Sequence, residues 1–458
     1  MSNVPFGFSA PDPDDPDNGS GQGAGGGADA ASDPISALFG GNSPADFGAA
    51  LQQFGQLMSS SSGPVNWELA KDTARQALAS SGDPSITSGE RTAVVEAIRL
   101  ADLWLDSATE LASAVAQPKA WSRAEWVEQT ITRWQELIQT LAERVAQAQS
   151  ENLPQQLPEQ VRAMAGPFMG VMQQMSGVMF GMQVGQGLGA LATEVVGSTD
   201  VGVPLAPEGV AVLLPTNVSE FGSGLGVPAD EVRLYLALRE CAHIRLFHHA
   251  PWLRSRIIAA VNDYARGISI DMSGMESLIG GLDPTNPEAL NELMQSGVFE
   301  PPTTAEQQAA LERLETLLAL VEGWVDDVVF TAASPRLPST AALREALQRR
   351  RATGGPAEAT FETLVGLQLR PRRLREAAAF WRAVASDQGS GARDALWDHP
   401  DLLPNAEDLA DPEGFAAKLN DPSAGFDLSA LDNAPPAPAE PPIQRADGNE
   451  DGTDVQHS

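Results

Sequence analysis

Apolar residues recur every three to four positions along most of the chain, which is the spacing of amphipathic helices. No stretch alternates apolar and polar residues for long enough to build a sheet. The helical spacing disappears in residues 9–33 and 434–458, which are rich in Pro, Asp and Gly. Neither stretch can bury enough apolar surface to offset its chain entropy. We therefore predict a mainly α-helical, multi-helix body with disordered acidic N- and C-terminal tails.

Changes in composition divide the chain further. We expect an acidic arm with one short helix (residues 1–62) and then a region with a helical hairpin and a Gly- and Met-rich buried helix (63–200). A central helix pair (201–335), an Arg-rich helical region (336–425) and a tail (426–458) should follow.

The acidic arm contains one amphipathic segment, residues 43–58. Ser43, followed by Pro44 and Asp46, is typical of a helix N-terminus. Apolar residues follow at helical spacing: Phe47, Ala50, Leu51, Phe54, Leu57 and Met58. Two interpretations stay open, a helix that docks on its own body and a detachable helix that binds a partner.

Two long amphipathic segments, residues 89–117 and 121–149, are separated by Pro118 and predict an antiparallel helical hairpin. Their apolar stripes contain Val94, Val95, Ile98, Leu103 and Leu111, then Trp126, Ile131, Trp134, Leu137 and Leu141. We expect the tryptophans in the core.

The next segment has no charged residue between Arg162 and Glu194 and is long enough to cross a bilayer. Glycines recur every four residues, which allows close helix packing: Gly177, Gly181, Gly185 and Gly189. Four glutamines and the absence of flanking basic residues on the C-terminal side argue against a span. We predict a buried helix with a glycine face; a peripheral or re-entrant segment is the second interpretation.

Ionisable residues lie on the apolar stripe of the helix expected at residues 230–249. Arg239, Glu240 and His243 fall among Val232, Tyr235, Leu236, Leu246 and Phe247 and should face inward. An unpaired charge in a core is unfavourable, so these groups need partners. A second helix within residues 304–333 carries Glu322 at the edge of its apolar stripe and Asp326 one turn later.

These two helices carry a family resemblance. "RECAH" at 239–243 resembles the H-E-x-x-H zinc helix, and "EGWVD" at 322–326 resembles the Glu-x-x-x-Asp helix of gluzincin metallopeptidases. Over most of residues 165–415, runs such as "FGMQVGQGLGALATEV", "PWLRSRIIAAVNDYARGISID" and "LALVEGWVDDVV" resemble the actinobacterial DUF2342 family, described as zinc-dependent metalloproteases or hydrolases.

The resemblance implies a zincin-like body and metal-assisted hydrolysis of a peptide or amide. It implies Glu240 as the general base, with His243 and Glu322 as zinc ligands. Asp326 would hold an imidazole in place.

Arg239 stands where that motif has its first histidine ligand. A guanidinium group has only donors and cannot bind zinc. Three alternatives follow: a degenerate site in which Arg239 pairs with Glu322 or Asp326, a zinc site completed by His248, His249 or water, and a site unrelated to either. Cys241, two residues from His243, is expected to be a small buried residue.

The formal net charge of −32 argues against a nucleic-acid partner, because phosphate contacts need a clustered basic surface. Arginines nevertheless gather between residues 344 and 382, where we expect mostly internal pairing, or else a docking surface for an acidic protein or peptide. The residues of that surface would be Arg349, Arg350, Arg351, Arg372, Arg373 and Arg375. One cysteine and the absence of a signal-peptide pattern in residues 1–17 fit a cytoplasmic protein.

Overall fold

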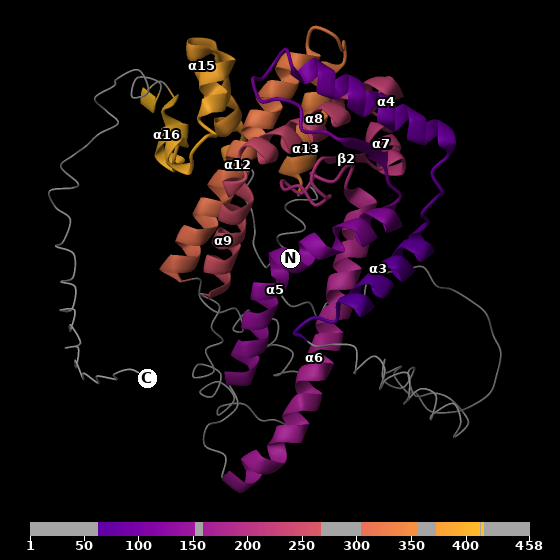
Figure 1. Cartoon of the computed structure of the whole chain (residues 1–458), viewed down its shortest axis with the longest axis vertical. Coiled ribbons are helices and arrows are strands. Elements are labelled where there is room, and N and C mark those ends of the chain that lie inside the picture. The colour runs from indigo at the N-terminus through magenta and orange to yellow at the C-terminus, as the bar shows by residue number, and fades with distance from the viewer. Residues whose placement is uncertain (1–62, 152–158, 267–303, 355–371, 413, 416–458) are drawn as a thin grey trace, which may run out of the picture. The chain divides into compact units, whose positions relative to one another are not determined.

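The computed structural model describes residues 63–151, 159–266, 304–354, 372–412 and 414–415. The chain divides into two compact units, Met1–Pro412 and Glu413–Ser458, and the helices and strands described here belong to the first. The predicted mainly α-helical class is confirmed, since these residues contain long helices and two four-residue strands (Figure 1). The helix expected at residues 43–58 and the two tails lie outside the described residues.

The elements follow one another from α3 to α16. In chain order they are α3 (Trp67–Ser81), α4 (Ser88–Leu105), β1 (Gln117–Ala120), α5 (Arg123–Glu151), α6 (Glu159–Glu194), β2 (Val210–Leu213), α7 (Pro215–Gly222), α8 (Ala229–His249), α9 (Trp252–Arg266), α12 (Ala305–Ala333), α13 (Thr340–Ala352), α15 (Arg372–Ala395), the short 3₁₀ helix η2 (Pro400–Leu402) and α16 (Ala406–Ala410).

Side-chain caps fix where two of the helices begin. At the start of α4, the Glu90 amide donates to the Thr87 hydroxyl and the Thr87 amide donates to the Glu90 carboxylate. Thr304 and Gln307 make the same reciprocal pair at the start of α12. Each pair satisfies two backbone donors that a helix leaves without partners, so both starts are encoded locally.

The predicted hairpin is replaced by a different connection. Helix α4 ends at Leu105, and Pro118 lies in β1, which pairs in parallel with β2. Proline is tolerated there because β1 is an edge strand of the two-stranded sheet that the described residues form. Helix α4 packs on α8, whereas α5 packs on α3, α6 and α9. Leu103, expected in the stripe, is 65% exposed, while Trp126 and Trp134 are in the core as predicted.

The glycine face of α6 makes a close contact with α3, but the helix is not buried on every side, since Met179 is 54% exposed. The backbone of α3 passes so near α6 that a Cβ on Gly181 would lie 2.6 Å from the Asn66 carbonyl oxygen. Gly185 and Gly189 face Ala70 and Ala74 in the same way. Within the described residues, no helix is long and apolar enough to cross a membrane.

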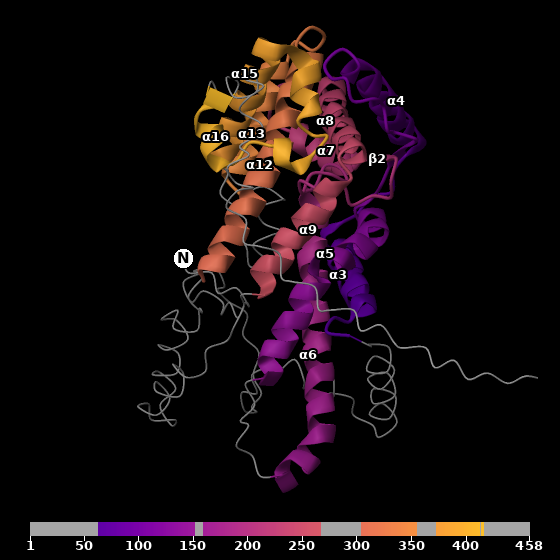
Figure 2. The same cartoon turned by 60° about the vertical axis from the view of Figure 1, so that its left-hand side comes forward.

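Helix α8 is the central element of this unit (Figures 1 and 2). It contacts α4, α7, α12, α13 and β2, and every residue from Tyr235 to Leu246 is buried. A helix covered on all sides has no solvent face for its polar residues. Arg239, Glu240 and His243 must therefore find their partners among the neighbouring elements.

Candidate functional site

The ionisable residues of α8 and α12 lie in the interior. Arg239 is 8% exposed, Glu240 and His243 are less exposed still, and both Glu322 and Asp326 of α12 are buried. Helices α8 and α12 contact each other, and Arg239 and His243 of α8 both reach Glu322 of α12. Glu240 points to a different neighbour.

Glu240 lies in a cage of hydrogen-bond donors from the segment between α6 and α7. Its carboxylate accepts hydrogen bonds from the backbone amides of Ser198 (3.1 Å), Thr199 (3.1 Å) and Val212 (3.0 Å). The hydroxyls of Ser198 and Thr199 donate to it as well. Burial raises the pKa of Glu240, against the opposing effect of these donors. None of the five hydrogen bonds involves His243 or Glu322, so this carboxylate anchors a loop.

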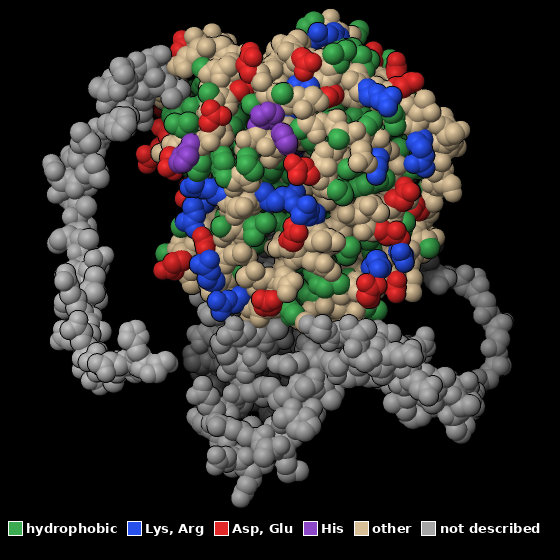
Figure 3. Space-filling view, in the orientation of Figure 1, with side chains coloured by type: hydrophobic (Ala, Val, Ile, Leu, Met, Phe, Trp, Pro, Cys, Tyr) green, Lys and Arg blue, Asp and Glu red, His purple; other side chains and the backbone are tan. Residues whose placement is uncertain are grey.

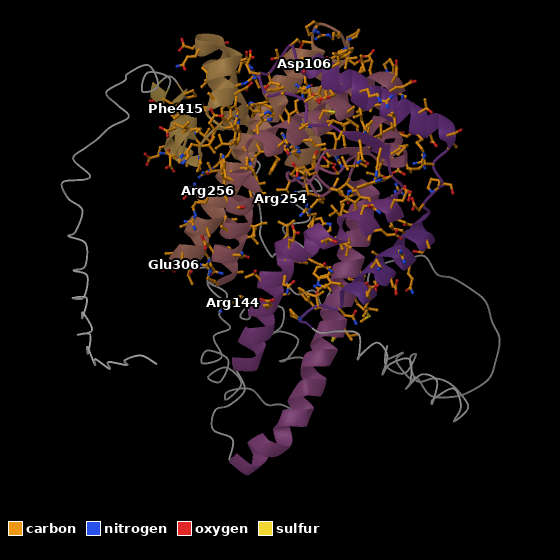
Figure 4. The ribbon with its side chains drawn as sticks, viewed as in Figure 1. Asp106, Arg144, Arg254, Arg256, Glu306 and Phe415 are labelled. Carbon is orange, nitrogen blue, oxygen red and sulfur yellow. The ribbon has the colours of Figure 1, made fainter. Side chains whose placement is uncertain are left out.

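The loop that supplies these donors is also held by residues on its other side. Gly197 lets the Glu240 carboxylate approach, because a Cβ there would lie 2.6 Å from Glu240 Oε2. Arg254 of α9, labelled in Figure 4, donates to the Pro204 carbonyl and lies 3.8 Å from the Glu136 carboxylate of α5. The segment from Val195 to Leu214 is therefore fixed from both sides.

Glu322 is the acceptor at the centre of the site. Arg239 Nη2 lies 2.6 Å from Glu322 Oε2, and Arg351 Nη2 of α13 lies 2.8 Å from Oε1. His243 Nε2 lies 3.0 Å from the same Oε1. Burial raises the pKa of Glu322, but the charges of Arg351, His243 and Arg239 outweigh it and hold that pKa well below its usual range. Glu322 is therefore a charged, fully paired carboxylate.

His243 has an acceptor at each ring nitrogen. Nδ1 lies 2.8 Å from the Arg239 carbonyl oxygen, which can only accept, so Nδ1 carries a proton. Nε2 faces the Glu322 carboxylate. Both ring nitrogens of His243 therefore lie within hydrogen-bond distance of an acceptor, and the ring joins Arg239 and Arg351 around Glu322.

Helix α13 covers this centre with arginines. Arg344 Nε lies 2.9 and 3.0 Å from the two oxygens of Asp326, and Arg350 Nη1 lies 3.0 Å from Asp200. Burial raises the pKa of Asp200, but Arg350, Arg351, the Val196 amide and Arg239 together hold that pKa below its usual value. The space between Arg239, Glu322 and α13 is about 20 Å³, room for about one water molecule.

The other candidate ligands lie elsewhere. His248 Nδ1 is 3.3 Å from Glu208 on the surface, and His249 Nδ1 donates to the Arg245 carbonyl. The two rings stack edge to face at the C-terminal end of α8. Cys241 is fully buried, and its thiol faces the Ile98 carbonyl of α4. The structure therefore brings neither the two histidines nor the thiol to Glu322.

These residues do not fit a zinc ion. Zinc sites in proteins need at least three protein ligands that converge on one point. Among the described residues, no group of three or more His, Cys, Asp or Glu side chains could hold a metal ion. His243 and Glu322 are close enough to share one, but guanidinium groups contact both oxygens of Glu322. The positive charge that a metal would supply is already supplied by arginine.

The arginines of the expected partner surface are divided between the interior and the exterior. Arg350 and Arg351 point inward, and Arg373 pairs with Glu312 of α12 at 2.6 Å. Arg349, 3.8 Å from Glu345, and Arg375 are exposed, and the side chain of Arg372 is outside the described residues. On the face in Figure 3, basic and acidic side chains are interspersed.

Residues 65–416 match the zincin-like metallopeptidase family. The chain belongs to the zincin-like metallopeptidase family. A crystal structure described as "a putative hydrolase with a novel fold" from Chloroflexus aurantiacus has the same fold, with a TM-score of 0.53 and 20% sequence identity. The similarity covers 78% of this zincin-like chain and 99% of that one, and no curated protein matches.

Several residues of this zincin-like centre were not assigned to it from the sequence. Ser198 and Thr199 follow α6 in a segment without a recognisable motif. Arg344 and Arg351 lie two turns apart on one helix, a spacing that predicts a shared face and internal pairing, but not the partners Asp326 and Glu322.

Proposed function

We propose that this protein is a non-catalytic member of its family, in which arginine has replaced the metal. The observation that carries the proposal is the 2.6 Å pair between Arg239 Nη2 and Glu322 Oε2, at the two positions that match zinc ligands in the family. A guanidinium group stays protonated and has only hydrogen-bond donors, so it cannot be a ligand of a divalent ion.

The surroundings of that pair support the proposal. Arg351 adds a second guanidinium group to Glu322, so the carboxylate has no free oxygen for a metal. Glu240, the counterpart of the general base, is surrounded by amide and hydroxyl donors. A buried pair of this kind contributes little net stability, but it is strongly unfavourable to break. The cluster therefore holds α8, α12 and α13 in one arrangement.

We propose that the molecule acts by binding a protein or peptide, and that it works in the cytoplasm. A groove of about 580 Å³ between the end of α6, α7 and α13 supports a peptide partner. Phe221, Leu225 and Ala346 supply its apolar part, and Arg349 stands exposed at its edge. We further propose that the chain is an actinobacterial DUF2342 member, on the sequence runs that resemble that family.

The test is the metal content of the natural protein, purified without a histidine tag, measured by mass spectrometry beside the variants Arg239→His and Arg256→His. The second variant is the control, since Arg256 is an exposed arginine of α9. We expect no zinc in the natural protein or the control. Zinc bound to the Arg239→His variant alone would mean that one arginine has displaced the metal from a site that can still hold it. If that variant also lacks zinc, Arg351 blocks the site as well.

Stoichiometric zinc in the natural protein would overturn the proposal. It would favour an active zinc metallopeptidase with a non-standard ligand set, which peptidase assays with the Glu240→Gln variant would then examine.

A further inference from the structure

In the described part of the chain, three helices end at the groove of about 580 Å³ between α6, α7 and α13. The last turn of α6 supplies Thr193 and Glu194 to its lining. The last turn of α7 supplies Glu220 and Phe221, and Thr353 directly follows α13. The C-terminal end of a helix carries a partial negative charge, because its peptide dipoles are aligned. The groove therefore combines the negative ends of α6, α7 and α13, which attract a positive charge.

Arg350 is the cation that the protein itself places at these helix ends. It donates to the Glu194 carbonyl, and its Nη1 lies 3.0 Å from an oxygen of the Asp200 carboxylate. Its guanidinium carbon also lies 5.8 Å from the centroid of the Phe221 ring. Since these three contacts already occupy the guanidinium group, Arg350 is a poor anchor for an acidic ligand.

The other charged residues of the lining favour a basic ligand. Glu220 lies 2.6 Å from Arg123, but the Glu220 side chain is 58% exposed and that of Arg123 only 7%. A ligand in the groove therefore meets the carboxylate of this pair and not its guanidinium group. Glu194 is exposed as well. Arg349, at the edge, already has the carboxylate of Glu345 as a neighbour at 3.8 Å.

The groove is apolar between these charges. Phe221 and Leu225 come from α7 and the turn after it, and Ala346 comes from α13. A volume of this size is typical of pockets that hold a ligand of a few residues. At longer range, the formal net charge of −32 raises the rate at which cationic ligands reach the protein. The groove thus suits an apolar side chain with positive charges on either side.

We propose that the groove binds a short basic peptide segment, in which one large apolar residue lies between two Lys or Arg residues. The apolar side chain packs on Phe221 and Leu225, and the flanking cations pair with Glu194 and Glu220. This inference rests on the proposed binding function and specifies its partner. An acidic peptide, which the arginines of α13 alone would favour, is the alternative that the test has to distinguish.

The test measures how tightly three peptides bind to the full chain, by fluorescence anisotropy at about 0.15 M salt. Each peptide carries an uncharged fluorophore. The basic peptide is Gly-Lys-Leu-Lys-Gly, and Glu or Gln replaces both lysines in the acidic and neutral peptides. We expect the basic peptide to bind about tenfold more tightly than either of the others.

Two variants locate the binding site, each beside a matched control. Glu194→Lys should weaken binding of the basic peptide about tenfold, because it places a cation beside the lysines of the peptide. Glu208→Lys makes the same change in net charge at an 83% exposed side chain outside the groove, and should change the affinity less than about twofold. Leu225→Ser should weaken binding about tenfold through lost apolar burial, whereas Leu402→Ser, at an exposed leucine outside the groove, should not.

Equal losses in Glu194→Lys and Glu208→Lys would overturn the proposal, because binding would then follow the net charge of the chain. Tighter binding of the acidic or neutral peptide would also overturn it. A dimer in sedimentation experiments that Leu225→Ser dissociates would assign the groove to a second copy instead. If no peptide binds and the natural protein contains no zinc, the assigned partner is wrong while the arginine-substituted centre stands. Zinc in a natural protein that binds the basic peptide would have the opposite meaning.

Discussion

The substitution Glu240→Gln separates a structural carboxylate from a catalytic one. The glutamine side chain has nearly the same shape, but its amide nitrogen must replace one acceptor oxygen. Suppose the side-chain oxygen of the glutamine keeps the hydrogen bonds from the backbone N–H groups of Ser198 and Val212. Its side-chain NH2 group then faces the backbone N–H of Thr199, and two donors oppose each other. A buried donor without a partner costs about 1–3 kcal/mol, and hydrogen bonds to a neutral acceptor are weaker than those to a charged one. We expect a local loss of about 2–4 kcal/mol.

The loss should concentrate in the loop that Glu240 anchors, so native-state hydrogen exchange is the suitable assay. Since about 1.4 kcal/mol is a factor of ten, the amides of residues 197–213 should exchange about thirty- to seven-hundredfold faster in the variant. Glu208→Gln is the matched control, because it makes the same change in the same loop at a side chain that is 83% exposed. Exchange in Glu240→Gln within about threefold of that control would refute the structural role, because this bound is far below the expected acceleration.

Three further outcomes are expected. Because the pKa of Glu322 is depressed on folding, its contribution to stability is complete above the unfolded pKa of about 4.3 and disappears as pH falls through the folded value. Acid titrations of unfolding should therefore be less steep below that pH in Glu322→Gln; an unchanged slope would contradict the pairing. Gly185→Ala should lower the free energy of unfolding by about 1–3 kcal/mol, because its Cβ would lie 2.7 Å from the Thr73 Cβ. Gly89→Ala on α4 should not, because its Cβ would meet only the Thr87 hydroxyl oxygen, at an ordinary contact distance of 4.0 Å. Tyr235→Phe should change that free energy by less than about 1 kcal/mol in urea unfolding, since the buried Tyr235 hydroxyl has no hydrogen-bond partner among the described residues; a larger loss would reveal one.

The sequence was most informative about features that the residue spacing within one helix decides. The glycine spacing of α6 predicts a close helix contact, and the structure has that contact with α3. The stripe of α8 predicts that Arg239, Glu240 and His243 face inward, and all three are buried. It was least informative at Pro118, where the partner of β1 is β2, about ninety residues later in the chain. Pairing over that separation leaves no local pattern.

By itself, then, the sequence determined the helical class, the family resemblance and the need for partners inside the core. The tertiary structure alone decided which partners those are. Arg239 and His243 lie one turn apart and share the side of α8 that faces α12, whereas Glu240 is turned about 100° from Arg239 and faces the loop before β2. Arg351 reaches Glu322 from a third helix. Charges in a core are satisfied by whatever the fold places around them, and several separate segments supply those surroundings here.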